Sequence, residues 1–111
     1  MATLEVLRSC VQAVLRDYAR QSAAAGDVDV QTVFDAEHDH YQVVNVGWRG
    51  DRRIYGTVLH IDVKDGKAWI QYNGTEMEVA EALVEQGLSK EDIVIGFHAP
   101  YKRRVTGFAV G

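Results

Sequence analysis

Four segments rich in β-branched and aromatic residues follow one another between residues 28 and 73, and short polar stretches separate them. This composition is typical of strands. We expect strands over Val28–Phe34, Tyr41–Trp48, Ile54–Val63 and Ala68–Asn73. Links this short leave no room for a crossover helix, so each strand must pair antiparallel with the next. The pattern therefore predicts an antiparallel β-meander.

The turn Lys64-Asp65-Gly66-Lys67 sets the register between the third and fourth of these strands. Asp-Gly tolerates the positive φ angles that a two-residue hairpin loop requires. Pairing centred on this turn gives one apolar face, with Val63 opposite Ala68, Ile61 opposite Ile70 and Leu59 opposite Tyr72. The other face then carries Asp62 with Trp69, His60 with Gln71 and Val58 with Asn73. We expect the first face to form the core and the second to be a candidate contact surface.

Two helices are predicted to cover the apolar face of this sheet. Residues 3–22 carry apolar side chains at helical spacing, and Thr3 is a suitable N-cap. Ala23-Ala24-Ala25 could extend this helix, and Gly26 should end it. Thr75-Glu76-Met77-Glu78 has the spacing of a capping box, so we expect a second helix to begin there. It should end at Gly87, with Leu88 folded back on it.

The residues after the second helix form a less regular end of the chain. Ser89–Asp92 repeats the helix-start pattern over one turn, and Ile93–Phe97 suits an edge strand or a buried turn. We expect the tail from His98 to Gly111 to be irregular and to lie on the surface or on a partner subunit. The predicted fold class is α+β: an antiparallel β-meander of four or more strands, packed in two layers against an N-terminal helix and a second helix.

Length and composition point to one ordered domain. The chain has 111 residues, which suits a single core over residues 1–111. Its apolar runs are far below the roughly 20 residues needed to cross a bilayer, and its N-terminus lacks the order of a signal peptide. Cys10 is the only cysteine, so no disulfide can form within the chain. We therefore expect a cytoplasmic protein without a membrane contact.

The sequence carries no recognisable catalytic motif. Its glycines are dispersed at turns rather than clustered before a helix, so no phosphate-binding loop is present. Cys10 lies in the first predicted helix without an obvious base, and no serine stands in a nucleophile context. We predict a protein that is not an enzyme and that binds no cofactor.

Two groups of residues contain metal-ligand types, and each also has an ordinary structural interpretation. Glu37-His38-Asp39-His40 lies in a polar loop, where a solvated turn is the simpler interpretation. His60 and Asp62 share the non-core face of the third strand and could bind a divalent cation if a further carboxylate joined them. Asp62 and Lys64 have the spacing of a metal-dependent nuclease, with Asp51 or Asp35 as the second carboxylate. Polar residues are expected beside a tight turn in any case, so we predict no metal site.

Basic residues gather beside aromatic ones in two places, around Arg52 and around Arg103. Such surfaces suit protein interfaces and nucleic acid alike, and the net charge of −4 gives no global attraction to DNA. We favour a protein interface over DNA and leave a solvated loop open. The candidate interaction surface comprises Trp48, Arg49, Arg52, Arg53, His60, Asp62, Trp69, Tyr101, Lys102, Arg103 and Arg104. The apolar end of the tail and the Trp69 face lead us to expect a homo-oligomer.

A resemblance to a known family extends over nearly the whole chain. The segments that carry it are Asp27–Gln31, Asp39–Gln42, Val46–Trp48, Asp51–Gly56, His60–Lys67, Trp69–Gln71, Asn73–Glu76, Gly96–His98 and Phe108–Gly111. In this order and spacing they resemble the XisI family, the excision controlling factors of cyanobacteria.

The resemblance implies a non-enzymatic accessory factor for site-specific excision of a DNA element from a nitrogen-fixation operon during heterocyst development. A separate site-specific recombinase would perform the recombination, and a companion controlling factor, XisH, would be the direct partner. The family supplies no catalytic residues that can be transferred to this chain. Two alternatives stay open: a metal-dependent nuclease-like subunit that uses Asp62 and Lys64, and direct DNA binding through the basic tail.

Overall fold

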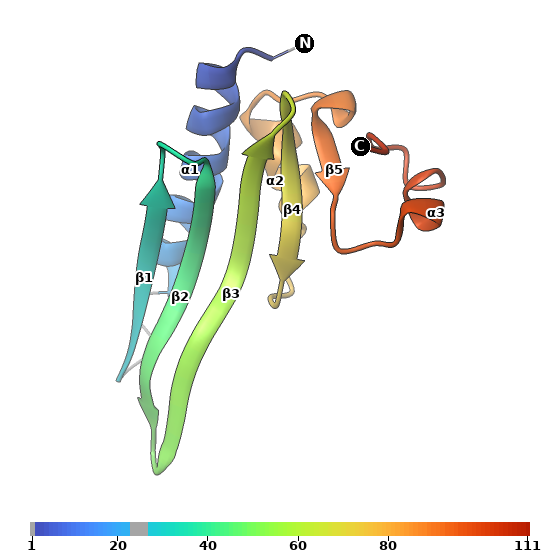
Figure 1. Ribbon diagram of the computed structural model, residues 1–111. Coiled ribbons are helices and arrows are strands. Elements are labelled where there is room, and N and C mark those ends of the chain that lie inside the picture. Colours follow the sequence, from blue (N-terminus) through green and yellow to red (C-terminus); the bar gives the residue numbers. More distant parts are fainter. Residues whose placement is uncertain (1, 23–26) are drawn as a thin grey trace.

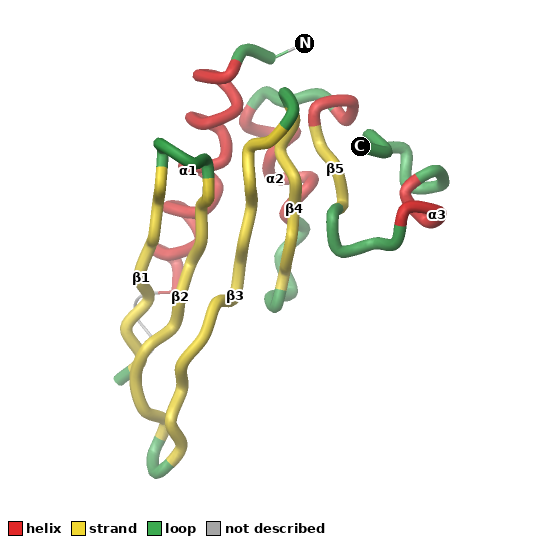
Figure 2. The backbone as a smooth tube through the Cα atoms, in the orientation of Figure 1, coloured by secondary structure: helices red, strands yellow, loops and turns green. Residues whose placement is uncertain are grey.

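The computed structural model describes residues 2–22 and 27–111, and these form one five-stranded sheet (Figures 1 and 2). Its strands lie side by side in chain order. They are β1 (Val28–Asp35), β2 (His40–Arg49), β3 (Arg52–Lys64), β4 (Lys67–Asn73) and β5 (Ile93–Ile95). The first four pair antiparallel, and β5 runs parallel to β4. The predicted antiparallel meander is confirmed, with one parallel strand added at its edge.

Two helices cover one face of the sheet. Both α1 (Leu4–Ser22) and α2 (Val79–Gln86) lie behind it in Figure 1. Two short turns, η1 (Lys90–Asp92) and α3 (Pro100–Arg103), stand before and after β5. Among the described residues no helix covers the opposite face, so the domain has two layers and an open sheet face. No helix in residues 2–22 and 27–111 is long and apolar enough to cross a membrane.

The first residue and the buried face of helix α1 agree with the sequence pattern. Its buried side chains are those of the predicted stripe, Leu7, Cys10, Val11, Val14 and Leu15. The Thr3 hydroxyl oxygen accepts a hydrogen bond from the Val6 amide at 3.3 Å, as an N-cap does. The predicted extension over residues 23–25 and the stop at Gly26 lie outside the described residues.

The core lies between the helices and the covered sheet face. Its largest fully buried side chains include Tyr41, Leu7, Leu15, Leu59, Ile61, Ile70, Leu83 and Ile93. Each fully buried aliphatic side chain contributes about 1.5–3 kcal/mol from removal of its surface from water. The apolar face predicted from the sequence is therefore the core face, except at Tyr72, which is 50% exposed.

The exception at Tyr72 results from a bulge in β4. Asp65 and Gly66 have the positive φ angles, 53° and 76°, that the predicted hairpin turn requires. The pairs next to this turn, including Ile61 with Ile70, are as predicted. The register then shifts, and His60 faces Tyr72 while Leu59 faces Asn73. The predicted pairs Leu59–Tyr72, His60–Gln71 and Val58–Asn73 are wrong, because Gln71 adds one residue to β4.

A second bulge divides the long β2–β3 hairpin. Val44 pairs with Thr57 and Val43 pairs with Leu59, which leaves Val58 as an extra residue on β3. Beyond this point the two strands continue to the turn at Gly50 and Asp51, at the lower end of Figure 1. Residues 44–57 of this hairpin extend past β4, and we call this stretch the arm; its outer part, residues 48–53, also extends past β1 as a two-stranded ribbon.

The start of α2 differs from its prediction. The helix begins at Val79, with Glu78 at the N-cap position, and not at the expected capping box. Thr75 instead bonds backward, since its hydroxyl lies 2.6 Å from the Asn73 side-chain oxygen and also accepts the Met77 amide at 3.1 Å. A short polar side chain that binds nearby backbone competes with helix formation, so these residues form a turn.

The end of α2 and the following turn are as predicted. Gly87 has φ 122° and its amide donates to the carbonyl groups of Leu83 and Val84, which closes the helix. Leu88 folds back, and its amide donates to the Leu83 oxygen at 3.2 Å. The helix-start pattern at Ser89 forms the capping box of η1.

The tail packs along the edge of its own domain. Of the two forms expected for Ile93–Phe97, an edge strand or a buried turn, Ile93–Ile95 forms an edge strand, β5, and is buried throughout. Beyond α3 the chain returns, so that Ala109 bridges Val94 and donates its amide to the Ile93 oxygen at 2.8 Å. The tail was expected on the surface or on a partner subunit, and in the structure it lies on the surface of its own domain.

Candidate functional site

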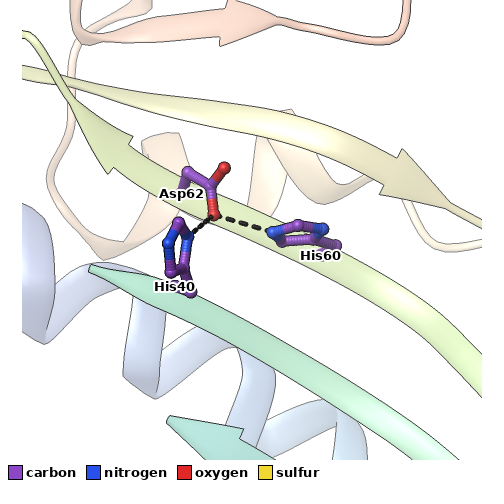
Figure 3. A group of neighbouring side chains, drawn as sticks. All are labelled: His40, His60 and Asp62. Atoms are coloured by element: carbon purple, nitrogen blue, oxygen red, sulfur yellow. Dashed lines mark hydrogen bonds and ion pairs between the residues drawn. The ribbon is translucent and has the colours of Figure 1, made fainter. Parts of the chain in front are cut away.

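Two histidines and an aspartate meet on the open face of the sheet (Figure 3). His40 Nδ1 lies 2.8 Å from Asp62 Oδ1, and His60 Nε2 lies 2.7 Å from the same oxygen. The two imidazole rings are 6.3 Å apart between centroids and nearly perpendicular, at 74°. We call these three residues the open-face cluster.

The strands place the members of the open-face cluster side by side. His40 begins β2 and faces Asp62 directly across the β2–β3 ladder. His60 precedes Asp62 by two residues on β3, so both side chains project from the same face. From β4, Gln71 donates its side-chain amide to Asp62 Oδ2 at 3.3 Å. The bulged residue of β4 therefore holds one carboxylate oxygen while the two histidines share the other.

The cluster favours an ionised aspartate. Burial of the Asp62 carboxylate opposes ionisation, but hydrogen bonds from His40 and His60 outweigh it and lower the Asp62 pKa. The hydrogen bond from Asp62 in turn raises the pKa of His40. The His40 side chain is 53% exposed and that of Asp62 is 15% exposed. The open-face cluster thus presents one negative oxygen between two imidazoles at a surface that solvent reaches.

Trp69 stands beside this cluster and is half-buried rather than freely exposed. Lys64 Nζ lies 4.5 Å from the centroid of its ring, and the Arg103 guanidinium lies 5.2 Å from it. Arg103 also donates to the carbonyl groups of His98 and Gly96, at 3.0 and 3.2 Å. Arg103 therefore anchors the tail to the open face, and Lys64 is drawn towards the indole.

Neither carboxylate considered as the second acidic residue of a nuclease-type site, Asp51 or Asp35, joins Asp62 in the group of possible metal ligands. Asp51 lies in the turn at the far end of the β2–β3 hairpin. Asp35 accepts hydrogen bonds from the Glu37 and His38 amides and from the His38 ring. The group of possible metal ligands found among the described residues contains Asp62 with two histidines and no second carboxylate.

The loop Glu37–His40 divides its residues between the two faces of the sheet. His38 pairs with Asp35, whereas His40 turns to the open-face cluster. Asp39 is drawn to the helix side, where both its oxygens accept from Arg8, at 2.7 and 3.0 Å. The Tyr41 hydroxyl also donates to Asp39, at 2.8 Å. This link between α1 and the sheet was not anticipated from the sequence, because its residues lie far apart in the chain.

The arm at the end of the β2–β3 hairpin carries the first basic group. Trp48 is 52% exposed and Tyr55 is 75% exposed, and the Arg53 guanidinium lies 5.3 and 6.0 Å from the two ring centroids. Arg49 and Arg52 face each other across the strands, and both are exposed. The arm is a compact, projecting surface of arginine and aromatic side chains.

The second basic group lies on and just after α3, beside the edge strand β5 (Figure 1). Tyr101, Lys102 and Arg104 are exposed there, with Tyr101 at 69%. Arg103 is the exception because it is half-buried against Trp69. The residues expected to form one interaction surface therefore occupy two regions: the arm, and the open face, where Trp69 lies between the open-face cluster and Arg103 of the tail.

Comparison with known proteins identifies the family. The model of the family described as XisI protein matches residues 1–110. The chain belongs to the XisI family. The resemblance seen in the sequence is thereby confirmed. No curated protein matches this XisI chain.

Solved structures that are similar to this XisI chain include two from one organism. A XisI-like protein from Anabaena variabilis ATCC 29413 has a TM-score of 0.86 and 45% identity, over 96% of this chain and 99% of that one. The fdxN element excision controlling factor XisI from the same organism has a TM-score of 0.83 and 29% identity, over 97% and 98% of the two chains. The match spans the domain in each case.

The sequence pattern predicts His60 and Asp62 on one face of this XisI domain but groups His40 with the separate loop Glu37–His40. The register of the β2–β3 hairpin joins them. Counting pairs from the β2–β3 turn at Gly50 and Asp51 would not have predicted this contact, because the extra residue at Val58 shifts every pair beyond it by one.

Proposed function

We propose that this XisI-family chain is a non-enzymatic accessory factor that controls excision of a DNA element through contact with another protein. The family match and the fdxN element excision controlling factor among its structural neighbours support the excision-control role. The observation that carries the contact hypothesis is the projecting arm with Trp48, Arg53 and Tyr55.

The arm has the composition of a protein-binding surface. Tryptophan, tyrosine and arginine are enriched in interface cores and among the residues that contribute most to binding. Here Arg53 lies against both exposed rings, so its side chain is partly ordered before a partner arrives, which lowers the entropic cost of binding.

The arm also presents unpaired backbone. Residues 52–57 of β3 pair with β2, whereas β4 pairs only with residues 59–64. Just after β4, the Gly74 amide donates a hydrogen bond to the Val58 oxygen. Among the described residues, this stretch of β3 therefore has a strand partner on one side only. An extended segment of a partner could add to this edge, while the arginines bind its acidic side chains.

The partner we propose is the companion controlling factor, XisH-like, with the site-specific recombinase as the alternative. The excision event would be that of heterocyst development. An acidic surface on the partner would complement Arg49, Arg52 and Arg53 and would speed association at low salt. In this proposal the strand cleavage belongs to the recombinase.

Co-purification with the companion factor tests the proposal. The variant Arg52→Glu/Arg53→Glu should lose binding, because both arginines are exposed on the arm. The matched variant Lys102→Glu/Arg104→Glu changes the net charge equally but lies on the tail, and it should still bind. Retention of the companion factor by both variants would remove the arm and the tail from the interface.

Direct DNA binding is the second candidate, and the shape of the arm favours it. A two-stranded β-ribbon fits the major groove, and arginine suits both phosphate and guanine contacts. With a net charge of −4 the arm would have to supply the attraction locally. Binding of a labelled duplex should then weaken steeply with salt and vanish in Arg52→Glu/Arg53→Glu. Absence of binding at low salt would reject this candidate.

A further inference from the structure

We propose that His40, His60 and Asp62 form a binding site for a divalent transition-metal ion of the zinc class on the open face of the sheet. The ligand atoms that these residues offer all lie within 4.8 Å of one another. The inference concerns a different part of the molecule from the arm and does not depend on the proposed function.

The ligand atoms need only small movements to surround an ion. Zinc binds imidazole nitrogen and carboxylate oxygen at about 2.0–2.2 Å, which places the ligands of a tetrahedral site about 3.3 Å apart. The two nitrogen-to-oxygen distances are 2.8 and 2.7 Å. Slight rotation of the side chains would open them to the required spacing, with the backbone unchanged.

The imidazole protons of the cluster can give way to a metal ion. Each imidazole nitrogen that now bonds Asp62 must offer a lone pair to the ion, so its proton moves to the other ring nitrogen or leaves to solvent. The ion then takes the place of these hydrogen bonds and faces the ionised carboxylate. Because His40 is 53% exposed, an ion can enter from solvent without opening the fold.

The surroundings of the cluster resemble those of metal ligands. Gln71 donates to Asp62 Oδ2 at 3.3 Å, which orients the carboxylate and leaves Oδ1 for the ion. Lys64, on the same strand, is drawn to the Trp69 ring, where its ammonium lies 4.5 Å from the centroid. The nearest basic side chain on β3 therefore has a partner other than Asp62.

The donor set selects the class of ion. Two imidazoles and one carboxylate suit Zn²⁺, Co²⁺ and Fe²⁺, whereas Mg²⁺ and Ca²⁺ prefer oxygen ligands alone. Three protein ligands leave at least one coordination position open towards solvent, where water or a donor from a binding partner would complete the site.

Calorimetric titration of the untagged, chelator-treated protein with Zn²⁺ tests the proposal. We expect one Zn²⁺ per chain and no comparable binding of Mg²⁺. The variants His40→Ala and His60→Ala should each weaken Zn²⁺ binding by more than tenfold. Gln71→Ala should weaken it by about ten- to a hundredfold, because the carboxylate loses its orientation. Co²⁺ should give a visible absorption band with the unaltered protein and none with His40→Ala/His60→Ala.

The control is His38→Ala, in the loop just before β2. That histidine pairs with Asp35 outside the cluster, so its removal should leave the Zn²⁺ affinity within about twofold of the unaltered value. Circular dichroism would verify folding, and the exposed position of His40 makes His40→Ala the safest variant. No Zn²⁺ binding up to about 100 µM, or equal affinity in His38→Ala and His40→Ala, would overturn the proposal.

Discussion

Replacement of Leu7 by alanine should remove a large part of the free energy of unfolding, because Leu7 packs α1 against the sheet. The Leu7 side chain is 0% exposed and belongs to the core cluster. Leucine-to-alanine changes at such sites cost about 2–5 kcal/mol, the lost transfer energy plus the energy of the cavity. A domain of 111 residues has a total stability of roughly 5–15 kcal/mol, so the variant loses a large share of it.

The matched control is Leu4→Ala on the same helix. Leu4 is 45% exposed, so the identical change removes little buried surface and should cost less than about 1 kcal/mol. Urea unfolding followed by circular dichroism measures both variants under identical conditions. In thermal unfolding, the midpoint of Leu7→Ala should lie about 10–20 °C below that of the unaltered protein. Equal midpoints for the two variants would refute the assignment of the buried face of α1.

Three further predictions concern the Asp39 link, the start of β1 and association. The Arg8 guanidinium holds the pKa of Asp39 below its usual value, so the stability from this pair is present above about pH 4 and is lost as the pH falls through the lowered pKa. The deficit of Arg8→Gln in urea midpoint should therefore shrink in acid, and a constant deficit down to pH 2 would contradict this. In Gly47→Ala the new Cβ would lie 2.2 Å from the Asp27 oxygen, so we expect a loss of roughly 1–3 kcal/mol, and a loss below about 0.5 would be inconsistent. Val105 is 85% exposed in the apolar tail, and we expect a homo-oligomer in sedimentation, which a monomer at high micromolar concentration would exclude.

Local rules were sufficient where neighbours in the sequence decide the structure. The apolar stripe of α1, the Asp65-Gly66 turn and the glycine end of α2 depend on residues within a few positions of one another. The capping-box prediction at Thr75 failed although its pattern is also local, because Asn73 offers the threonine hydroxyl a closer partner. Two local patterns competed there, and the sequence carries no measure of which is stronger.

Long-range contacts were beyond prediction for a different reason. The bidentate bond between Arg8 and Asp39 joins α1 to the β1–β2 turn across 31 positions, and many acidic residues could have met that arginine. Docking of α1 on the sheet decides which one does. The tail is similar, because the contact of Arg103 with Trp69 and the bridge between Val94 and Ala109 also join residues far apart in the chain.

The amino-acid sequence by itself determined the meander and most of its core face, since strand composition, short links and the Asp65-Gly66 turn leave few other arrangements. The family was indicated separately, by the resemblance of segments spread over the whole chain. Only the tertiary structure decided the open-face cluster. Counted from the pair Arg49–Arg52, an unbroken ladder would set His40 opposite Ile61, nine steps along each strand. The extra residue at Val58 moves His40 opposite Asp62 instead. The bulge lets Val43 pair with Leu59, and both side chains are fully buried in the core. Packing on the core face therefore sets which side chains meet on the open face.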